Sequence, residues 1–187
     1  METSIPELHR WSLEEYHQLI ESGGFDEDAR VELIDGLLVD MSPRTREHEN
    51  ALAWLDHVLQ VSLDYERFQV RTAMALTLDT SEPEPDLAVI EAGAPRPYHP
   101  GTAALVIEVS VSSLRRDLRQ KPIVYARAGV PLYWVVDLDG GRAVVHSEPG
   151  RDGYAHVETI GPDGALAAPQ LGIAAIPLAD VLAASRR

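Results

Sequence analysis

The chain is organised around residues 85–121, which contain PDLAVI at residues 85–90 and ALVIEVS at residues 104–110 and end at Lys121. Both runs are apolar enough to form buried strands. Each carries one carboxylate, Asp86 at the start of the first run and Glu108 near the end of the second. An ionised carboxylate on a buried strand is costly unless it is paired, hydrogen-bonded or bound to a metal. The two acids therefore predict a cation between them.

Length and composition predict one globular domain over residues 1–187. The chain is 45% hydrophobic and 25% charged, which is ordinary for a globular protein. It has no cysteine, so disulfides, thiolate zinc sites and cysteine nucleophiles are excluded. The first residues carry no positively charged segment followed by an apolar one, and no run reaches the roughly 20 apolar residues of a bilayer span. We therefore expect a soluble, cytoplasmic protein with no membrane partner.

Charge is unevenly distributed along the chain. The formal net charge of −14 argues against a general nucleic-acid coat, and solubility is the simplest reason for it. However, four of the 16 basic residues lie within seven positions, Arg115, Arg116, Arg119 and Lys121, with Asp117 as the only acid among them. A basic patch directly after an acidic strand is typical of a metal-dependent phosphodiesterase.

Lys121 is the only lysine in the protein, because the other 15 basic residues are arginine. Lysine is a compact point charge on a flexible stem, whereas arginine is a planar fork that stays protonated. A site that needs the chemistry of lysine would resist replacement by arginine. The alternative is a coding bias with one lysine left by chance, which would fall at this position about one time in 16.

The remaining pattern predicts a mixed α/β sheet, an α+β arrangement with flanking helices and an added β-hairpin. Ser12 and Glu15 form a capping-box pattern at the start of a first helix. The elements expected after it are a hairpin at Asp35-Gly36, a helix over about residues 47–63, strands within residues 67–78, 85–90 and 104–110, a helix over residues 117–129, a strand over residues 130–138, a hairpin after Gly140-Gly141, and a short amphipathic helix at the end.

Three positions carry open alternatives. Glu32 lies on the first hairpin strand, where alternation favours a solvent-facing side chain by about two to one. His48 begins the second helix, and the pattern favours a solvated or locally hydrogen-bonded imidazole over one that contacts a phosphate. Pro122 is awkward inside a helix, so the helix of residues 117–129 either starts late or kinks beside Lys121.

The loop of residues 93–101, with three prolines and His99, predicts a rigid surface connection.

The acids and the lysine together predict metal-assisted phosphoryl chemistry. Asp86 and Glu108 on neighbouring strands can point to one face, and oxygen ligands with retained waters suit Mg²⁺ or Mn²⁺. Glu32 can complete or orient this set. Lys121 would lie near the attacking water, where it lowers the pKa of that water or stabilises developing negative charge.

Several segments together resemble a known family. PDLAV, VIEVS, DLRQK and YARAGVPLYWVVD, with VELIDG and SPRTREH upstream, are similar to the Uma family of putative restriction endonucleases, within the PD-(D/E)XK nuclease superfamily. The resemblance covers roughly residues 11–136. It implies a restriction-endonuclease-like αβ core, with Asp86 and Glu108 as metal ligands and Glu32 as the upstream acid. Ser110 occupies the usual position of the superfamily's lysine, and similar family members take the lysine from the following helix, which matches Lys121.

Two functions follow as hypotheses. The first is a Mg²⁺-dependent DNA endonuclease in which Asp86 and Glu108 hold the metal, Lys121 assists water and Glu32 supports the site. His48, Arg115, Arg116 and Arg119 are then candidates for substrate binding, and a homodimer would suit two-strand cutting. The second is an inactive nuclease-fold binding or assembly module, in which Lys121 only neutralises Asp86 and Glu108 as a structural ion-pair cluster.

Overall fold

The computed structural model describes residues 9–26, 28–93 and 99–187. Most of the predicted loop of residues 93–101 lies outside these described residues. Along the chain the elements are α1 (Leu13–Glu21), β1 (Val31–Ile34), β2 (Leu37–Asp40), α2 (Arg46–Ser62), β3 (Phe68–Thr72), β4 (Leu87–Glu91), β5 (Leu105–Ser110), α3 (Leu114–Arg119), α4 (Lys121–Arg127), β6 (Leu132–Asp137), β7 (Arg142–Gly150), β8 (Gly153–Ile160), β9 (Ala165–Ala168), the 3-10 turn η1 (Pro169–Leu171), β10 (Ile173–Pro177) and α5 (Leu178–Ser185).

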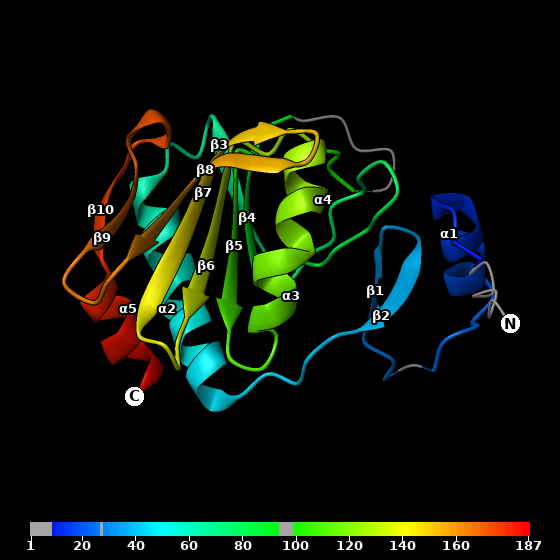
Figure 1. Ribbon diagram of the computed structural model, residues 1–187, viewed down its shortest axis with the longest axis horizontal. Coiled ribbons are helices and arrows are strands. Elements are labelled where there is room, and N and C mark those ends of the chain that lie inside the picture. The colour runs from blue at the N-terminus through cyan, green and yellow to red at the C-terminus, as the bar shows by residue number, and fades with distance from the viewer. Residues whose placement is uncertain (1–8, 27, 94–98) are drawn as a thin grey trace, which may run out of the picture.

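A six-stranded mixed sheet forms the centre of the molecule, in the order β3-β4-β5-β6-β7-β8 (Figure 1). Strands β5 and β6 are parallel, and the other neighbouring pairs are antiparallel. Helices α3 and α4 make the crossover between the two parallel strands, as parallel strands require. The predicted mixed α/β sheet with flanking helices is therefore confirmed.

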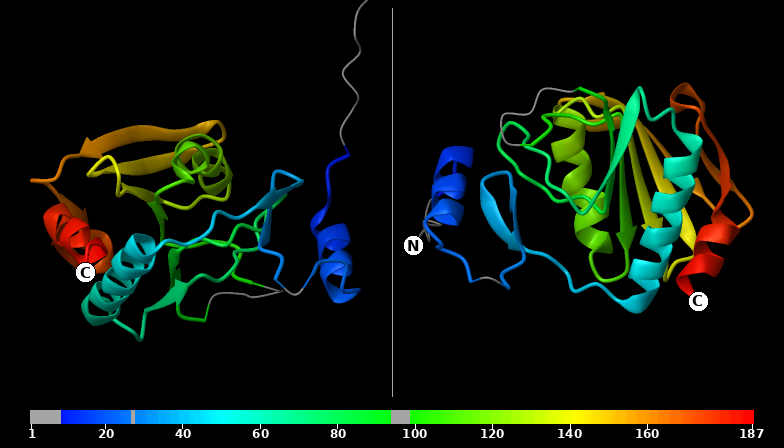
Figure 2. Two further views of the ribbon diagram at one scale, coloured as in Figure 1. Left: turned by 90° about the horizontal axis from the view of Figure 1, so that it is seen from below. Right: turned by 180° about the vertical axis from the view of Figure 1, so that it is seen from behind.

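Helices cover both faces of this sheet, which explains why its central strands are apolar throughout (Figure 2). On β5, Leu105 and Ile107 pack on the side of α2 and α5. Val106 packs on the opposite side, against Val124 and Tyr125 of α4. Because side chains alternate along a strand, Glu108 shares the face of Val106 and points toward α3 and α4. This alternation places the acid on the side from which the lysine arrives.

The predicted Asp35-Gly36 hairpin is present as β1 and β2, which pair antiparallel. The hairpin is a separate two-stranded unit beside the main sheet (Figure 1). A bridge between Leu33 and Glu82 attaches β1 to the loop that leads into β4. The N–H of Asp35 also donates to the Ser81 hydroxyl at 2.8 Å. These contacts hold β1 next to the segment that carries Asp86.

Two sequence predictions need correction, and one element was not predicted. The strand predicted within residues 67–78 ends at Thr72, because Ala73 has a φ of +49° and leaves the extended conformation. The helix predicted over residues 117–129 is two helices that meet at Gln120. A second small hairpin, β9 with β10, was not predicted at all. No helix among the described residues is long and apolar enough to cross a bilayer.

Candidate active site

Glu32 reaches the site from β1 and is buried, so the expectation of a solvent-facing side chain is wrong. Its side chain is 1% exposed. The backbone N–H of Glu84 donates to Glu32 Oε2 at 3.3 Å, and Lys121 Nζ lies 3.2 Å from the same oxygen. The alternation rule failed here because a loop and a helix of the main body cover this face of the small hairpin.

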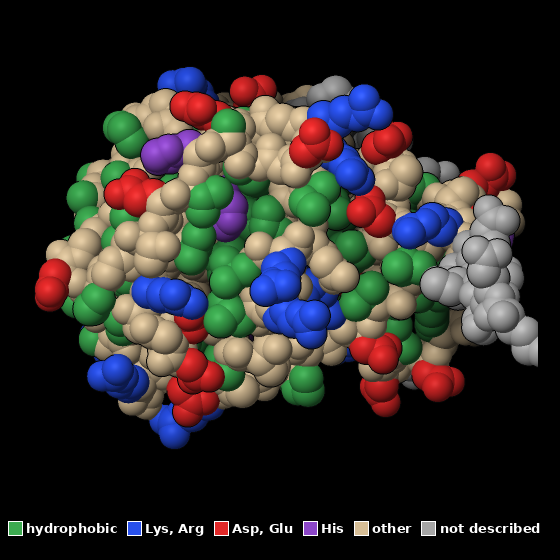
Figure 3. Space-filling view, in the orientation of Figure 1, with side chains coloured by type: hydrophobic (Ala, Val, Ile, Leu, Met, Phe, Trp, Pro, Cys, Tyr) green, Lys and Arg blue, Asp and Glu red, His purple; other side chains and the backbone are tan. Residues whose placement is uncertain are grey.

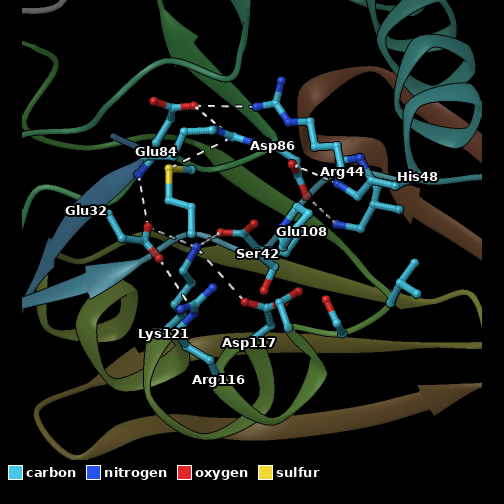
Figure 4. Close-up of a pocket in the computed structure, with 17 residues that line it drawn as sticks. Glu32, Ser42, Arg44, His48, Glu84, Asp86, Glu108, Arg116, Asp117 and Lys121 are labelled. Carbon is cyan, nitrogen blue, oxygen red and sulfur yellow. Dashed lines mark hydrogen bonds and ion pairs between the residues drawn. The ribbon is translucent and has the colours of Figure 1, made fainter. Parts of the chain in front are cut away.

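Asp86 and Glu108 are brought together by the pairing of β4 with β5. Asp86 directly precedes β4, and its Oδ2 accepts a hydrogen bond from the backbone N–H of Val109 at 2.8 Å. That bond fixes the Asp86 carboxylate beside the residue that precedes Val109, which is Glu108. The two predicted acids therefore meet at one end of adjacent strands, as Figure 4 shows.

Burial raises the pKa of Glu108 well above its ordinary value. The positive charge of Lys121 acts in the opposite direction, and the negative charges of Asp117, Asp86 and Glu32 add to the rise. Removal from water and repulsion by the neighbouring carboxylates thus act in the same direction on the pKa of Glu108. A further cation in this place would favour the ionised form of Glu108.

Lys121 joins the acids from the first position of α4. Its Nζ donates to Glu108 Oε1 at 2.8 Å and lies 3.2 Å from Glu32 Oε2 and 4.0 Å from Asp117 Oδ1. Burial alone would lower the pKa of Lys121, but Glu108, Glu32 and Asp117 together raise it above its ordinary value. Lys121 is therefore an ammonium group and not a proton acceptor.

Pro122 does not displace the lysine, because the chain breaks into two helices beside it. Gln120 ends α3 and precedes α4, and Pro122 lies in the first turn of α4. A missing N–H costs no helical hydrogen bond there. The hydroxyl of Ser110, at the end of β5, donates to Asp117 Oδ2 at 2.7 Å and ties α3 to the strand. Ser110, which occupies the position where the superfamily usually has its lysine, thus anchors the helix that leads to Lys121.

Two further buried side chains, Tyr125 and Asp117, belong to the site and were not predicted as part of it. The Tyr125 hydroxyl donates to Glu108 Oε1 at 3.0 Å, so that oxygen accepts from both Tyr125 and Lys121. Asp117 Oδ1 is buried and makes no hydrogen bond. The sequence did indicate that these residues share a helix face, since Asp117, Lys121 and Tyr125 are spaced one helical turn apart. Only the tertiary structure shows that this face meets Glu108.

His48 is neither solvated nor only locally bonded, contrary to the favoured interpretation. Its side chain is buried on α2, and its Nε2 lies 3.0 Å from Asp86 Oδ1. The Thr45 hydroxyl accepts from the backbone N–H of His48 at 3.3 Å and caps α2, which places His48 in the first turn of the helix. His48 therefore contacts a predicted metal ligand and lines the same pocket.

The three arginines of α3 are divided between two places. Arg116 enters the pocket, where its Nε lies 3.6 Å from Glu32 Oε1, and it donates to the Asp40 carbonyl at 2.8 Å. Arg115 and Arg119 line an adjoining surface groove that also contains Arg116. Basic side chains gather over α3 in Figure 3. The predicted basic patch thus lies next to the acids, with one member inside the pocket.

The pocket carries more negative than positive charge. By formal charge, five acids line it against four permanent cations: Glu32, Glu84, Asp86, Glu108 and Asp117, with Arg30, Arg44, Arg116 and Lys121. Glu32 Oε1 and Asp117 Oδ1 are buried without a hydrogen-bond partner. Each faces one cation at longer range, Arg116 Nε at 3.6 Å from Glu32 Oε1 and Lys121 Nζ at 4.0 Å from Asp117 Oδ1. Carboxylate oxygens that accept no hydrogen bond in such a pocket are suited to a hard cation.

The fit to a metal rests on two carboxylates. Among the residues that the structure describes, no three His, Asp or Glu side chains are arranged as a metal-binding group. Mg²⁺ does not require such a group, because it keeps several waters and is usually bound through one or two carboxylates. Asp86 and Glu108 satisfy that smaller requirement. The donor set therefore fits Mg²⁺ better than a metal that needs a complete protein cage.

Comparisons with known proteins bear on the fold and on the family of this chain. A crystal structure described as a putative nuclease belonging to DUF820, from Anabaena variabilis ATCC 29413, matches with a TM-score of 0.75 and 14% sequence identity, over 93% of this chain and 98% of that chain. At this identity the match shows a shared fold. None of the curated proteins matches the sequence. The sequence model of the Uma2 family, described as "Putative restriction endonuclease", matches residues 13–179. The predicted resemblance is thus confirmed, and the chain belongs to the Uma2 family.

Proposed function

We propose that this chain is a Mg²⁺- or Mn²⁺-dependent endonuclease that hydrolyses the phosphodiester bonds of DNA. Membership of a family described as restriction endonucleases supports a nuclease. The observation that carries the proposal is the meeting of three separated acids, Glu32, Asp86 and Glu108, with the protein's only lysine in one pocket. These are the groups that metal-assisted phosphoryl hydrolysis requires.

Asp86 and Glu108 would hold the metal. Bound there, Mg²⁺ would polarise the phosphoryl group and acidify a water molecule. Asp86 Oδ2 accepts a hydrogen bond from the Val109 N–H, and Asp86 Oδ1 lies 3.0 Å from His48 Nε2, so each oxygen has one neighbour. Each carboxylate oxygen has two lone pairs, so both retain a free one. Glu32 supports the site through Lys121, which it holds at 3.2 Å.

Lys121 would stabilise negative charge on the phosphoryl oxygens and the attacking water. Its ammonium group is fixed by buried acids, so it needs little reorganisation during the reaction, which is the condition for effective electrostatic stabilisation. The carboxylates around Lys121 raise its pKa, so the proposal gives it the role of a charge-stabilising ammonium group and not that of the proton acceptor. The proton must therefore pass to solvent or to another acceptor.

The substrate is proposed to be DNA, bound through its phosphates. Arg116 in the pocket and Arg115 and Arg119 in the adjoining groove supply positive charge where the site needs it. Although the whole chain has a net charge of −14, this basic patch attracts phosphate at the place where the DNA backbone would approach. A homodimer would present two such pockets and allow both strands to be cut.

A second candidate function is a binding or assembly module without catalysis. It is favoured by one observation, that Lys121 already pairs with Glu108 at 2.8 Å and with Glu32 at 3.2 Å. Buried charges are often paired for structural reasons alone. Under this alternative the cluster would bind no metal and cleave no DNA.

Substitution of Lys121 separates the two functions. We expect Lys121→Met to lower cleavage of linear and supercoiled DNA by at least about 100-fold, as loss of a charge-stabilising donor does, while the variant still binds Mn²⁺. Lys121→Arg keeps the charge in a different geometry and should also lose most activity. Because it leaves no acid unpaired, it serves as the variant that folds if Lys121→Met does not. Arg142→Met removes an ion pair elsewhere, with Asp137 at 2.9 Å, and should cleave normally.

Two results would contradict the proposal. Full cleavage activity in folded Lys121→Met or Lys121→Arg would remove the lysine from the mechanism. No cleavage of linear, supercoiled, single-stranded or branched DNA by the native protein, with Mg²⁺ or Mn²⁺ present, would favour the non-catalytic module.

A further inference from the structure

Two arginines outside the predicted site, Arg30 and Arg44, line the same pocket as the acids. Arg30 directly precedes β1, and Arg44 lies in the loop between β2 and α2. In Figure 4 Arg44 and Arg116 lie on opposite sides of the acidic centre. The pocket thus has basic side chains on both sides, and only the side of Arg116 was predicted.

Both arginines are held by one oxygen of one carboxylate. Arg44 lies 3.4 Å and Arg30 3.9 Å from Glu84 Oε1. The exposed fractions of the side chains are 28% for Arg44, 40% for Arg30 and 34% for Glu84. Long, partly exposed ion pairs contribute little free energy, so either guanidinium can leave Glu84 at small cost. The buried pair of Lys121 with Glu108 at 2.8 Å is a different kind of contact.

We propose that Arg44, assisted by Arg30, forms a second phosphate-binding arm opposite Arg116, and that Glu84 competes with the DNA phosphate for this arm. The inference rests on the proposed function, since it assigns the far side of the same substrate path. DNA would then cross the acidic centre with a phosphate held on each side of the one that is hydrolysed.

Three features distinguish this arm from a structural ion pair. A guanidinium presents a fork that matches two oxygens of a phosphate, whereas here two guanidinium groups share a single carboxylate oxygen. Glu84 performs its structural role through its backbone, whose N–H donates to Glu32, and does not need its side chain for it. Finally, a net negative pocket repels phosphate, so a path across it requires cations on both sides.

The test is a binding measurement that does not depend on catalysis. Fluorescence anisotropy of a short labelled DNA duplex, titrated with protein in EDTA at several salt concentrations, gives the affinity and its salt dependence without metal-dependent cleavage. We expect Arg44→Gln to weaken binding about tenfold and to lower the slope of log affinity against log salt by about 1, as loss of one phosphate contact does. Arg151→Gln, an exposed arginine in the β7–β8 turn, is the matched control and should bind like the native protein.

Glu84→Gln should change affinity in the opposite direction. It removes the competing charge but keeps the backbone bond to Glu32, so we expect binding several-fold tighter than that of the native protein. In the double variant with Arg44→Gln most of this gain should disappear, because the released arginine is no longer present.

The outcomes separate the two claims. Binding that is unchanged in Arg44→Gln and in Glu84→Gln would overturn the second arm while leaving DNA as the substrate. No binding by the native protein would overturn the arm and the DNA substrate together. Weaker binding in Glu84→Gln would show that Glu84 organises the arm and does not compete for it, which would overturn that part of the proposal.

Discussion

At the scale of the residue, the hydroxyl of Tyr125 makes a contact whose energy can be measured. It donates to Glu108 Oε1 in the buried site. Removing a donor from a buried charged acceptor costs more than removing one from a neutral acceptor. We expect Tyr125→Phe to lower the free energy of unfolding by about 1.5–3 kcal/mol at mildly alkaline pH, where Glu108 with its raised pKa is ionised, measured by urea denaturation.

Tyr154→Phe is the matched control for this prediction. Tyr154 belongs to the same aromatic cluster, with its ring 6.3 Å from that of Tyr133, but its hydroxyl donates to the neutral Val130 carbonyl at 2.8 Å. Its loss should cost about 1 kcal/mol. Equal costs for the two variants would mean that Tyr125 does not support an ionised Glu108.

A site residue could be predicted from the sequence where its residue type differs from that of its neighbours. Asp86 and Glu108 interrupt apolar runs, and Lys121 is the only lysine, so each differs from its surroundings. His48 and Arg44 lie in polar segments where their residue types are ordinary. Their roles depend on tertiary contacts, with Asp86 for His48 and with Glu84 for Arg44, that no local pattern encodes.

At the scale of the element, the β1–β2 hairpin depends on one glycine. Gly36 has a φ of +74° in the turn, and an added Cβ would lie 2.8 Å from Arg10 Cβ and 3.1 Å from the Trp11 carbonyl oxygen. We expect Gly36→Ala to lower the free energy of unfolding by about 1–3 kcal/mol, from backbone strain and steric overlap. Because the hairpin carries Glu32, DNA cleavage should fall as well.

Gly23→Ala separates strain from overlap. Gly23 has a similar φ of +70° after α1, but an added Cβ would meet nothing within 4 Å. Its cost should be about 1 kcal/mol, from strain alone. A loss for Gly36→Ala no greater than that of Gly23→Ala would show that the packing of the turn against the N-terminal segment does not matter.

Elements were predictable where the sequence marks their ends. Asp35-Gly36 marks a hairpin turn and Ser12 with Glu15 marks a helix start, and the structure has both. The β9–β10 hairpin lies in an alanine-rich segment with weak strand preference, so nothing local indicated it. Pro122 indicated that the helix of residues 117–129 is disrupted. It did not indicate whether the helix starts late or breaks in two, because that depends on packing.

At the scale of the whole molecule, the sheet makes the site from segments far apart in sequence. Glu32 arrives with the hairpin, Asp86 and Glu108 arrive with adjacent strands, and Lys121 arrives with the crossover between parallel strands. The general architecture could be predicted from the apolar runs and from the family resemblance. The position of the hairpin against the main body could not, since it rests on contacts such as that of Leu33 with Glu82.

A calorimetric titration with Mn²⁺ tests the proposed metal site at its ligand Asp86. Asp86→Asn keeps an oxygen that can accept from the Val109 N–H but removes the negative charge of the proposed ligand. Asp137→Asn is the matched control, a buried acid at the end of β6, paired in register with Ser110 but bonded to Arg142 and Gly140. We expect saturable Mn²⁺ binding by the native protein and by Asp137→Asn, and its loss in Asp86→Asn. No metal-dependent heat for the native protein, or the same heat for Asp86→Asn, would contradict the metal site.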